Sequence, residues 1–304
     1  MYLATYEYDN RQTIGLLAEN QKHIIPLNAA EQYYLGQNTL PAAMLDLIRQ
    51  GDAAFDTVRS IAGKFTARKQ PSLLLPVDSV RLKAPIPRPA KNIFCVGKNY
   101  AEHAMEFDKT KDPAAAIPQY PVIFTKPPTT VTGPDDPVSS HSGVTGALDY
   151  EVELAVIIGK QGCSIAQENA MDHVFGFTIL NDVTARDLQS RHLQWFLGKS
   201  LDTFAPMGPY LVHKSAVADP GCLDVCCKIN GEIRQQANTR SFIFDIPTLI
   251  STISAGITLE PGDIISTGTP AGVGAGFIPP KFLQPGDLME CSISGLGTLR
   301  NKIV

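Results

Sequence analysis

The amino-acid sequence predicts a strand-rich α+β fold, a mixed β-roll or barrel with a few helices. Most of the chain consists of short apolar runs of strand length that are rich in β-branched and aromatic residues. The chain has 24 glycines and 23 prolines, which separate these runs. Few long helical stretches lie between them, so a regular strand–helix alternation is excluded. The main expected strands are residues 92–96, 121–125, 154–158, 175–180, 223–229, 263–267 and 288–293.

The first part of the chain, residues 1–82, is expected to form a small α+β domain. Strand composition is found at residues 3–6 and 13–17, and helical spacing at residues 42–49 and 53–64. The segment 83–91 follows, and its prolines at alternate positions favour an extended chain and prevent a helix from continuing. We therefore expect a proline-rich linker at 83–91, followed by a larger domain at 92–304.

Composition and charge exclude several classes of partner. The 304 residues are 44% hydrophobic and carry a net charge of −4 from 26 basic and 30 acidic residues, without a basic block that would bind a phosphate backbone. No apolar run approaches the roughly 18 residues that span a bilayer. The first residues also lack the basic and apolar regions of a signal peptide. We therefore expect no nucleic-acid or membrane partner, and a cytoplasmic location.

The six cysteines are expected to be buried and reduced. Three of them cluster, at positions 222, 226 and 227, but their spacing matches no zinc motif with a second ligand pair. A cytoplasmic protein keeps its thiols reduced, and a free cysteine packs as a small apolar side chain. The cysteines therefore predict neither a disulfide framework nor a zinc site.

The segment 149–159 has the most informative pattern in the chain. Side chains alternate between the two faces of a strand, and one face here carries Glu151 and Glu153 followed by apolar residues. The other face is apolar throughout, so the strand is expected to be buried on both sides. Two adjacent buried carboxylates cost on the order of several kcal/mol, unless a hard cation such as Mg²⁺ or Mn²⁺ lies between them. The alternative is a strand end that exposes both glutamates to solvent.

A third carboxylate favours a metal site. An apolar run over residues 175–181 ends at Asp182, and a strand end presents a ligand rigidly. Alternatively, Asp182 is only a turn or capping residue. Residues 184–187 match a capping box that opens a helix over 188–196. After this helix, Lys199 is either a group that binds a substrate carboxylate or polarises its carbonyl, or a surface lysine that stabilises the helix end.

Three further segments are candidates for parts of a functional site. His103 and Glu106 share a face if residues 100–107 are helical, and a carboxylate that orients an imidazole lets it take up a proton. The alternative is a fortuitous pair on a surface helix. Residues 108–120, which have no clear period, are interpreted as a flexible segment that can fold over a site. Residues 267–274 are either a plain turn or a glycine-rich loop whose amides, with the Thr269 hydroxyl, bind a substrate carboxylate.

Five motifs in this order resemble the fumarylacetoacetate hydrolase family. They are residues 96–106, 149–153, 181–189, 198–200 and 267–274. The first 80 or so residues resemble the small N-terminal domain of the bacterial branch that includes oxaloacetate decarboxylases and acylpyruvate hydrolases. For residues 92–304 the resemblance implies a mixed β-sandwich roll that is the catalytic, metal-binding domain. It also implies a homodimer with one Mg²⁺ or Mn²⁺ per subunit.

The resemblance implies roles for individual residues as well. Glu151, Glu153 and Asp182 match the positions of the metal ligands, and Lys199 matches a position in the active site. Arg186 and Gln189 match positions that approach the substrate. His103 and Glu106 match two residues that pair with each other on a mobile lid. Lys98 stands where many relatives carry arginine. It is a candidate substrate contact without the two parallel hydrogen bonds that an arginine offers a carboxylate.

We therefore expect a Mg²⁺- or Mn²⁺-dependent hydrolase or lyase that breaks a C–C bond of a small 2-oxo acid. Oxaloacetate decarboxylation and the hydrolysis of acylpyruvates such as fumarylpyruvate share a pyruvate enolate that a cation stabilises. One alternative is an isomerase or hydratase of 2-hydroxy-dienoates in aromatic catabolism. Another is a non-catalytic protein that binds 2-oxo acids, against which the presence of both His103 and Glu106 argues.

Overall fold

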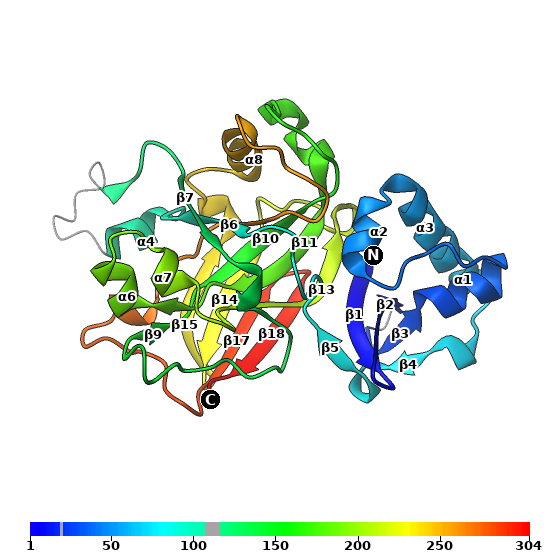
Figure 1. The fold of residues 1–304 in the computed structure, drawn as a ribbon, viewed down its shortest axis with the longest axis horizontal. Coiled ribbons are helices and arrows are strands. Elements are labelled where there is room, and N and C mark those ends of the chain that lie inside the picture. The colour runs from blue at the N-terminus through cyan, green and yellow to red at the C-terminus, as the bar shows by residue number, and fades with distance from the viewer. Residues whose placement is uncertain (19–20, 107–115) are drawn as a thin grey trace.

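The computed structural model describes residues 1–18, 21–106 and 116–304, and its largest element is a mixed sheet of twelve strands (Figure 1). Ten of the strands follow one another in the order β4 (Leu75–Pro76), β3 (His23–Pro26), β2 (Arg11–Leu17), β1 (Tyr2–Tyr8), β13 (Ala205–His213), β11 (Val174–Asn181), β10 (Val152–Ile158), β16 (Ile264–Ser266), β6 (Ile93–Gly97) and β7 (Val122–Lys126). The other two are β5 (Arg81–Lys83), which pairs with β1, and β8 (Val131–Thr132), which pairs with β13. Among the described strands of this sheet, only the β6–β16 and β8–β13 pairs are parallel.

A second sheet packs against one face of the large one. Its four antiparallel strands lie in the order β15 (Glu232–Asn238), β14 (Asp224–Ile229), β17 (Leu288–Ile293) and β18 (Gly297–Lys302). Val225 and Met289 of this sheet share a hydrophobic cluster with Leu154 of β10, and helix α8 (Ile246–Ser254) adds Leu249 to it. Two sheets with an apolar layer between them confirm the predicted strand-rich sandwich.

Strand β10 is buried on both faces, as its sequence predicts. Leu154 and Val156 lie in the cluster between the two sheets, whereas Ala155 and Ile157 lie in a second cluster on the opposite face. Each fully buried aliphatic side chain stabilises the fold by about 1.5–3 kcal/mol. Because side chains alternate, Glu153 belongs to the same face as Ala155. The strand that carries the acidic motif is therefore fixed in the core from both sides.

The N-terminal part continues the large sheet. Its strand β1 pairs with β13, with Leu3 opposite Leu211, and Figure 1 shows the helices of this part, in blue, beside its strands. The helices are α1 (Leu27–Leu35), α2 (Met44–Arg49) and α3 (Asp52–Ala67). They cover the second cluster. The domain boundary at 83–91 stays a prediction, and one sheet runs through the parts on either side of it. None of the helices in the described residues is long and apolar enough to cross a membrane.

Most segments predicted from the sequence agree with the structure to within a few residues, but the helix predicted at 188–196 is wrong. Two short helices, α6 (Arg186–Arg191) and α7 (Phe196–Lys199), take its place, and Leu193 between them has a left-handed φ of 59°. The capping box is also wrong, because the N-cap of α6 is Ala185 and no side chain caps it. Helix α7 folds back so closely on α6 that a Cβ on Gly198 would lie 2.5 Å from the Gln189 nitrogen. This return brings Lys199 toward the acidic motif.

The cysteines are free, as predicted, but not all are buried. Cys163 and Cys222 are exposed, Cys226 is half-buried, and Cys95, Cys227 and Cys291 are buried. The exposed pair lies outside the regular strands, where the sequence carries no apolar period. The prediction of uniform burial is therefore wrong for Cys163 and Cys222.

His213, at the end of β13, connects the large sheet to the N-terminal helices. Its buried ring stacks on Phe55 of α3 with ring centroids 3.8 Å apart. The Nδ1 atom accepts the backbone N–H of Ser215 at 3.1 Å, which suits a neutral imidazole. Burial, helped by the N-terminus, Arg59 and Lys214, lowers the pKa of His213 from its usual 6.5 to about 4. The folded chain therefore disfavours the charged ring.

We predict that His213 makes the protein less stable in mild acid. The unfolded chain takes up a proton near pH 6.5 and the folded chain only near pH 4, so stability present above pH 6.5 is lost as the pH falls through this interval. Urea unfolding at about pH 7 and pH 4.5 measures this loss. Between these two pH values the free energy of unfolding should fall by roughly 1–3 kcal/mol more in wild type than in His213→Phe, a variant that keeps an aromatic ring on Phe55. Equal losses in both proteins would contradict the prediction.

Candidate metal centre

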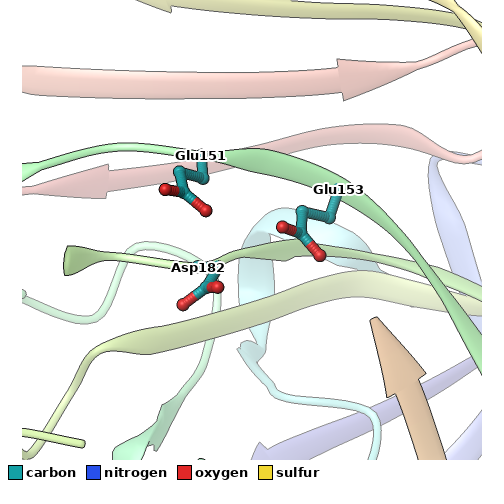
Figure 2. A group of neighbouring side chains, drawn as sticks. All are labelled: Glu151, Glu153 and Asp182. Carbon is teal, nitrogen blue, oxygen red and sulfur yellow. The ribbon is translucent and has the colours of Figure 1, made fainter. Parts of the chain in front are cut away.

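Three carboxylates converge at one end of β10 and β11 (Figure 2). Glu151 immediately precedes β10, Glu153 lies within it, and Asp182 immediately follows β11. The antiparallel register places Glu153 opposite Leu180, and the Asp182 backbone N–H donates to the Glu151 carbonyl at 2.8 Å. One oxygen from each of the three lies within 4.8 Å of the others, and all three residues are buried. The alternative in which Glu151 and Glu153 are exposed to solvent is therefore wrong.

Buried cations surround two of these carboxylates. The Lys199 Nζ lies 2.8 Å from Glu151 Oε2 and 2.7 Å from Asp182 Oδ2. The Lys126 Nζ lies 2.5 Å from Asp182 Oδ1, and Arg186 lies 2.7 Å from Glu151 Oε1. Burial alone would raise the pKa of Glu151, but Lys199 and Arg186 outweigh it and hold that pKa at about 2. Glu151 is therefore ionised near neutral pH, as a candidate metal ligand should be.

Glu153 has a different environment. Its Oε2 atom accepts hydrogen bonds from the Ser266 hydroxyl at 2.6 Å and the Gly268 N–H at 2.9 Å. Within the described ranges it forms no ion pair. Burial, together with the negative charges of Asp182 and Glu151, raises the pKa of Glu153 well above its usual value. This carboxylate lacks a positive partner, and a cation between the three side chains would provide one.

The three side chains fit a divalent cation. Carboxylate oxygens are the ligands that Mg²⁺ and Mn²⁺ prefer, and such ions retain several waters in addition to one to three protein carboxylates. The set has neither histidine nor cysteine, so it does not suit a zinc or copper site. Glu153 has no positively charged partner in the described ranges, and the oxygen donors are hard ligands. Both features favour Mg²⁺ or Mn²⁺.

The predicted dyad forms. Helix α4 (Ala101–Glu106) brings the His103 Nδ1 to 2.8 Å from Glu106 Oε2. An ionised carboxylate only accepts hydrogen bonds, so Nδ1 carries the proton and Nε2 is the basic nitrogen of the neutral ring. The other Glu106 oxygen accepts the Gly272 N–H at 2.7 Å. The helix is therefore anchored to the glycine-rich loop. The segment expected to act as a lid lies largely in 107–115, outside the described residues.

The glycine-rich loop binds protein carboxylates. Its amides at Gly268 and Gly272 donate to Glu153 and Glu106, and that at Gly274 donates to Asp149 at 2.6 Å. The amide of Ala275, which follows the loop, also donates to Asp149, at 3.0 Å. The Thr269 hydroxyl donates to the Val152 carbonyl at 3.0 Å and accepts from Gln235 at 2.8 Å. These groups therefore hold the protein scaffold together, although Thr269 also faces the pocket described next.

Eight of the ten residues singled out from the sequence line one pocket of about 200 Å³: Lys98, His103, Glu151, Glu153, Arg186, Gln189, Lys199 and Thr269. The other two contact its lining, Glu106 through His103 and Asp182 through Lys199. This volume is below the roughly 300–1,000 Å³ typical of sites for drug-sized ligands. The pocket therefore suits a small molecule.

Two aromatic side chains that the sequence did not indicate also line this pocket. Phe124 and Trp195 make an edge-to-face contact with centroids 5.4 Å apart. A Cβ on Gly97 would lie 2.3 Å from the Trp195 ring, so a glycine lets the indole pack against β6. The Lys199 ammonium lies 5.1 Å from the Phe124 ring centroid. Aromatic walls thus close the pocket beside its charged groups.

Two buried charges at the site were also missed from the sequence. Lys126 directly follows the predicted strand 121–125, and Asp149 opens the acidic motif. Both are completely buried. Their only signal in the sequence was that a charged residue stands at the end of an apolar strand. The same pattern occurs where a strand simply emerges into solvent, so it does not predict a buried charge. Their partners, Asp182 and Arg186, lie far along the chain and become neighbours only through folding.

Comparisons with known proteins agree with this geometry. An oxaloacetate tautomerase of Bacillus subtilis (strain 168) is 50% identical over 305 residues, which cover 100% of both chains. A mitochondrial oxaloacetate tautomerase of Homo sapiens is 42% identical over 96% of this chain and 87% of its own.

Solved structures of similar proteins match the whole chain. A fumarylacetoacetate hydrolase from Exiguobacterium antarcticum has a TM-score of 0.81 and 41% identity, with 100% of this chain and 99% of that chain covered. A maleylpyruvate hydrolase from Sphingobium sp. SYK-6, solved with manganese (II) and pyruvate, has a TM-score of 0.75, 33% identity and the same coverage. The family model for the fumarylacetoacetate (FAA) hydrolase C-terminal region matches residues 92–304. The chain is therefore an enzyme that belongs to the fumarylacetoacetate hydrolase family.

Proposed function

We propose that this enzyme catalyses the keto–enol tautomerisation of oxaloacetate, with Mg²⁺ or Mn²⁺ bound by Glu151, Glu153 and Asp182. The observation that carries the proposal is one pocket lined by Glu151, Glu153 and His103. Asp182 and Glu106 are hydrogen-bonded to its lining, through Lys199 and His103 respectively. The names of the 50% and 42% identical relatives support the substrate. Tautomerisation needs only a proton transfer beside the 2-oxo group, so it asks less of the site than the C–C cleavage predicted from the sequence.

The charges of the pocket favour a small dicarboxylate. Lys98, Arg186 and Lys199 line it, together with the amide of Gln189. An arginine and two lysines attract an anion and fix its orientation through charge-assisted hydrogen bonds. A divalent cation bound beside them would add positive charge next to the 2-oxo group, which lowers the energy of an enolate.

The dyad supplies the proton transfer. The Glu106 carboxylate holds Nδ1–H of His103, so Nε2 can take a proton from C3 of the keto acid. The electrons of the C3–H bond then form the C2–C3 double bond, and the C2–O π electrons move onto the 2-oxo oxygen. This oxygen takes up the proton from the protonated His103, which gives the enol and restores the base. The reverse sequence converts the enol to the keto form. Because Glu106 is anchored by Gly272, the ring is held in one orientation throughout.

A second candidate is the hydrolysis of an acylpyruvate. The similar maleylpyruvate hydrolase was solved with pyruvate and manganese (II), which supports this chemistry on the same scaffold. There His103 would deprotonate a water that attacks the 4-carbonyl, and the C3–C4 bond would break to leave pyruvate. Oxaloacetate decarboxylation needs no such base, because CO₂ leaves without an added nucleophile.

We predict that Glu153→Ala abolishes divalent-metal binding and turnover while the protein stays folded. The substitution removes one of three ligands, and it also removes a buried charge that is repelled by Asp182 and Glu151. Calorimetric titration with Mn²⁺, together with circular dichroism, measures both effects. Glu168→Ala, at an exposed glutamate, is the matched control and should behave as wild type. Full activity of wild type in excess chelator would refute the metal site.

We predict that His103→Ala slows tautomerisation at least about a hundredfold, the usual contribution of a positioned base. Loss of the ultraviolet absorbance of enol-oxaloacetate, corrected for the spontaneous rate, measures it. Acylpyruvate hydrolysis, where present, should fall by a similar factor and decarboxylation by less. His192→Ala changes an exposed histidine between α6 and α7 and serves as control. An unchanged tautomerisation rate would remove His103 from the proposal, and equal losses in all three reactions would indicate substrate positioning instead.

A further inference from the structure

Asp149 is a buried carboxylate that is neither a candidate metal ligand nor part of the His103–Glu106 dyad. It lies in β9 (Leu148–Asp149), which pairs with β12 (Thr184–Ala185), and its side chain is completely buried. One oxygen accepts the N–H of Gly274 at 2.6 Å and the other that of Ala275 at 3.0 Å. The second oxygen also accepts from Arg186 Nε at 2.8 Å. The glycine-rich loop therefore fixes Asp149, and Asp149 holds one edge of Arg186.

Arg186 divides its single charge between two carboxylates. Its Nε edge faces Asp149, and its Nη2 atom lies 2.7 Å from Glu151 Oε1. Its Nη1 atom donates to the Gln189 side chain at 3.2 Å. Arg186 and Gln189 both line the pocket. The guanidinium thus connects a residue outside the pocket to a ligand of the candidate metal centre.

We propose that Asp149 is a positioning residue that acts through Arg186 to keep Glu151 available to a divalent cation, an inference that rests on the proposed metal site. The contact between Arg186 Nε and Asp149 directs part of the positive charge of Arg186 away from Glu151. Without the Asp149 carboxylate, the guanidinium would pair with Glu151 alone. It would then compete with the cation for the same carboxylate and be free to tilt.

The surroundings of Asp149 suit this role. A buried carboxylate is expensive unless it is paired and hydrogen-bonded, and both oxygens of Asp149 accept from N–H donors, one of which is the Arg186 guanidinium. A Cβ on Gly274 would lie 2.7 Å from Asp149 Oδ1, so a glycine is needed where the loop meets the carboxylate. The Asp149 side chain therefore has little freedom to move, and its hydrogen bond restricts the movement of the Arg186 guanidinium.

The test is the affinity for Mn²⁺ in the absence of substrate, measured from the electron paramagnetic resonance signal of the free ion. Residues that orient metal ligands typically change metal affinity 10–100-fold when they are mutated. We expect Asp149→Asn to weaken Mn²⁺ binding by that factor. Asp149→Ser removes the same charge with a smaller side chain and gives the same test if the asparagine is not accommodated. Asp187→Asn is the matched control, because the Asp187 carboxylate accepts hydrogen bonds from the Thr145 hydroxyl and the Gly146 N–H.

A double-mutant cycle separates this role from a merely structural one. If Asp149 acts through Arg186, then Asp149→Asn should change Mn²⁺ affinity by less than about twofold when Arg186→Met is already present. Equal losses in both backgrounds, or wild-type affinity of the folded single variant, would overturn the inference while the metal site stands. If wild type binds no Mn²⁺, the metal site fails, and the inference fails with it.

Discussion

Four buried carboxylates gathered around three buried cations form the constraint on which the rest of the structure depends. Asp149, Glu151, Glu153 and Asp182 lie beside Lys126, Lys199 and Arg186, and all of these side chains are at least nine-tenths buried. Removing such charges from water costs several kcal/mol for each ion unless partners are placed accurately. The strands and loops that carry them must therefore be fixed in position. The two-sided burial of β10 and the folding back of α7 onto α6 both serve that requirement.

The glycine-rich loop is the common support of the site. Its amides hold Glu153, Glu106 and Asp149, which belong respectively to the metal centre, the dyad and the contact with Arg186. Gly272 has a φ of 101°, and a Cβ there would lie 1.9 Å from the Arg234 carbonyl oxygen, so no other residue fits. One segment thus sets the position of Glu153, a candidate cation ligand, relative to the His103–Glu106 dyad. Several carboxylates can be held this close together only with such backbone donors, because the side chains alone would repel one another.

The sequence predicted the parts of the site that are local in the chain. Alternation in 149–159 identified Glu151 and Glu153, the end of an apolar run identified Asp182, and helical spacing paired His103 with Glu106. Charges whose partners are distant were not predicted. Lys126 meets Asp182 across 56 residues, and nothing around Lys126 specifies that partner. The prediction of a helix at 188–196 was wrong for a related reason. The packing of Gly198 against α6 determines where the chain turns, and the local sequence does not specify that contact.

The central claim is that three carboxylates from β10 and the end of β11 hold one divalent cation within reach of the dyad. Anomalous scattering from a crystal grown with Mn²⁺ tests it most directly. The account predicts one anomalous peak in each chain, with an oxygen from each of Glu151, Glu153 and Asp182 about 2.0–2.2 Å away, and with Lys199 moved off at least one of the carboxylates that it now contacts. No peak at this position, or a peak bound by other residues while the three carboxylates keep their present contacts, would contradict the account.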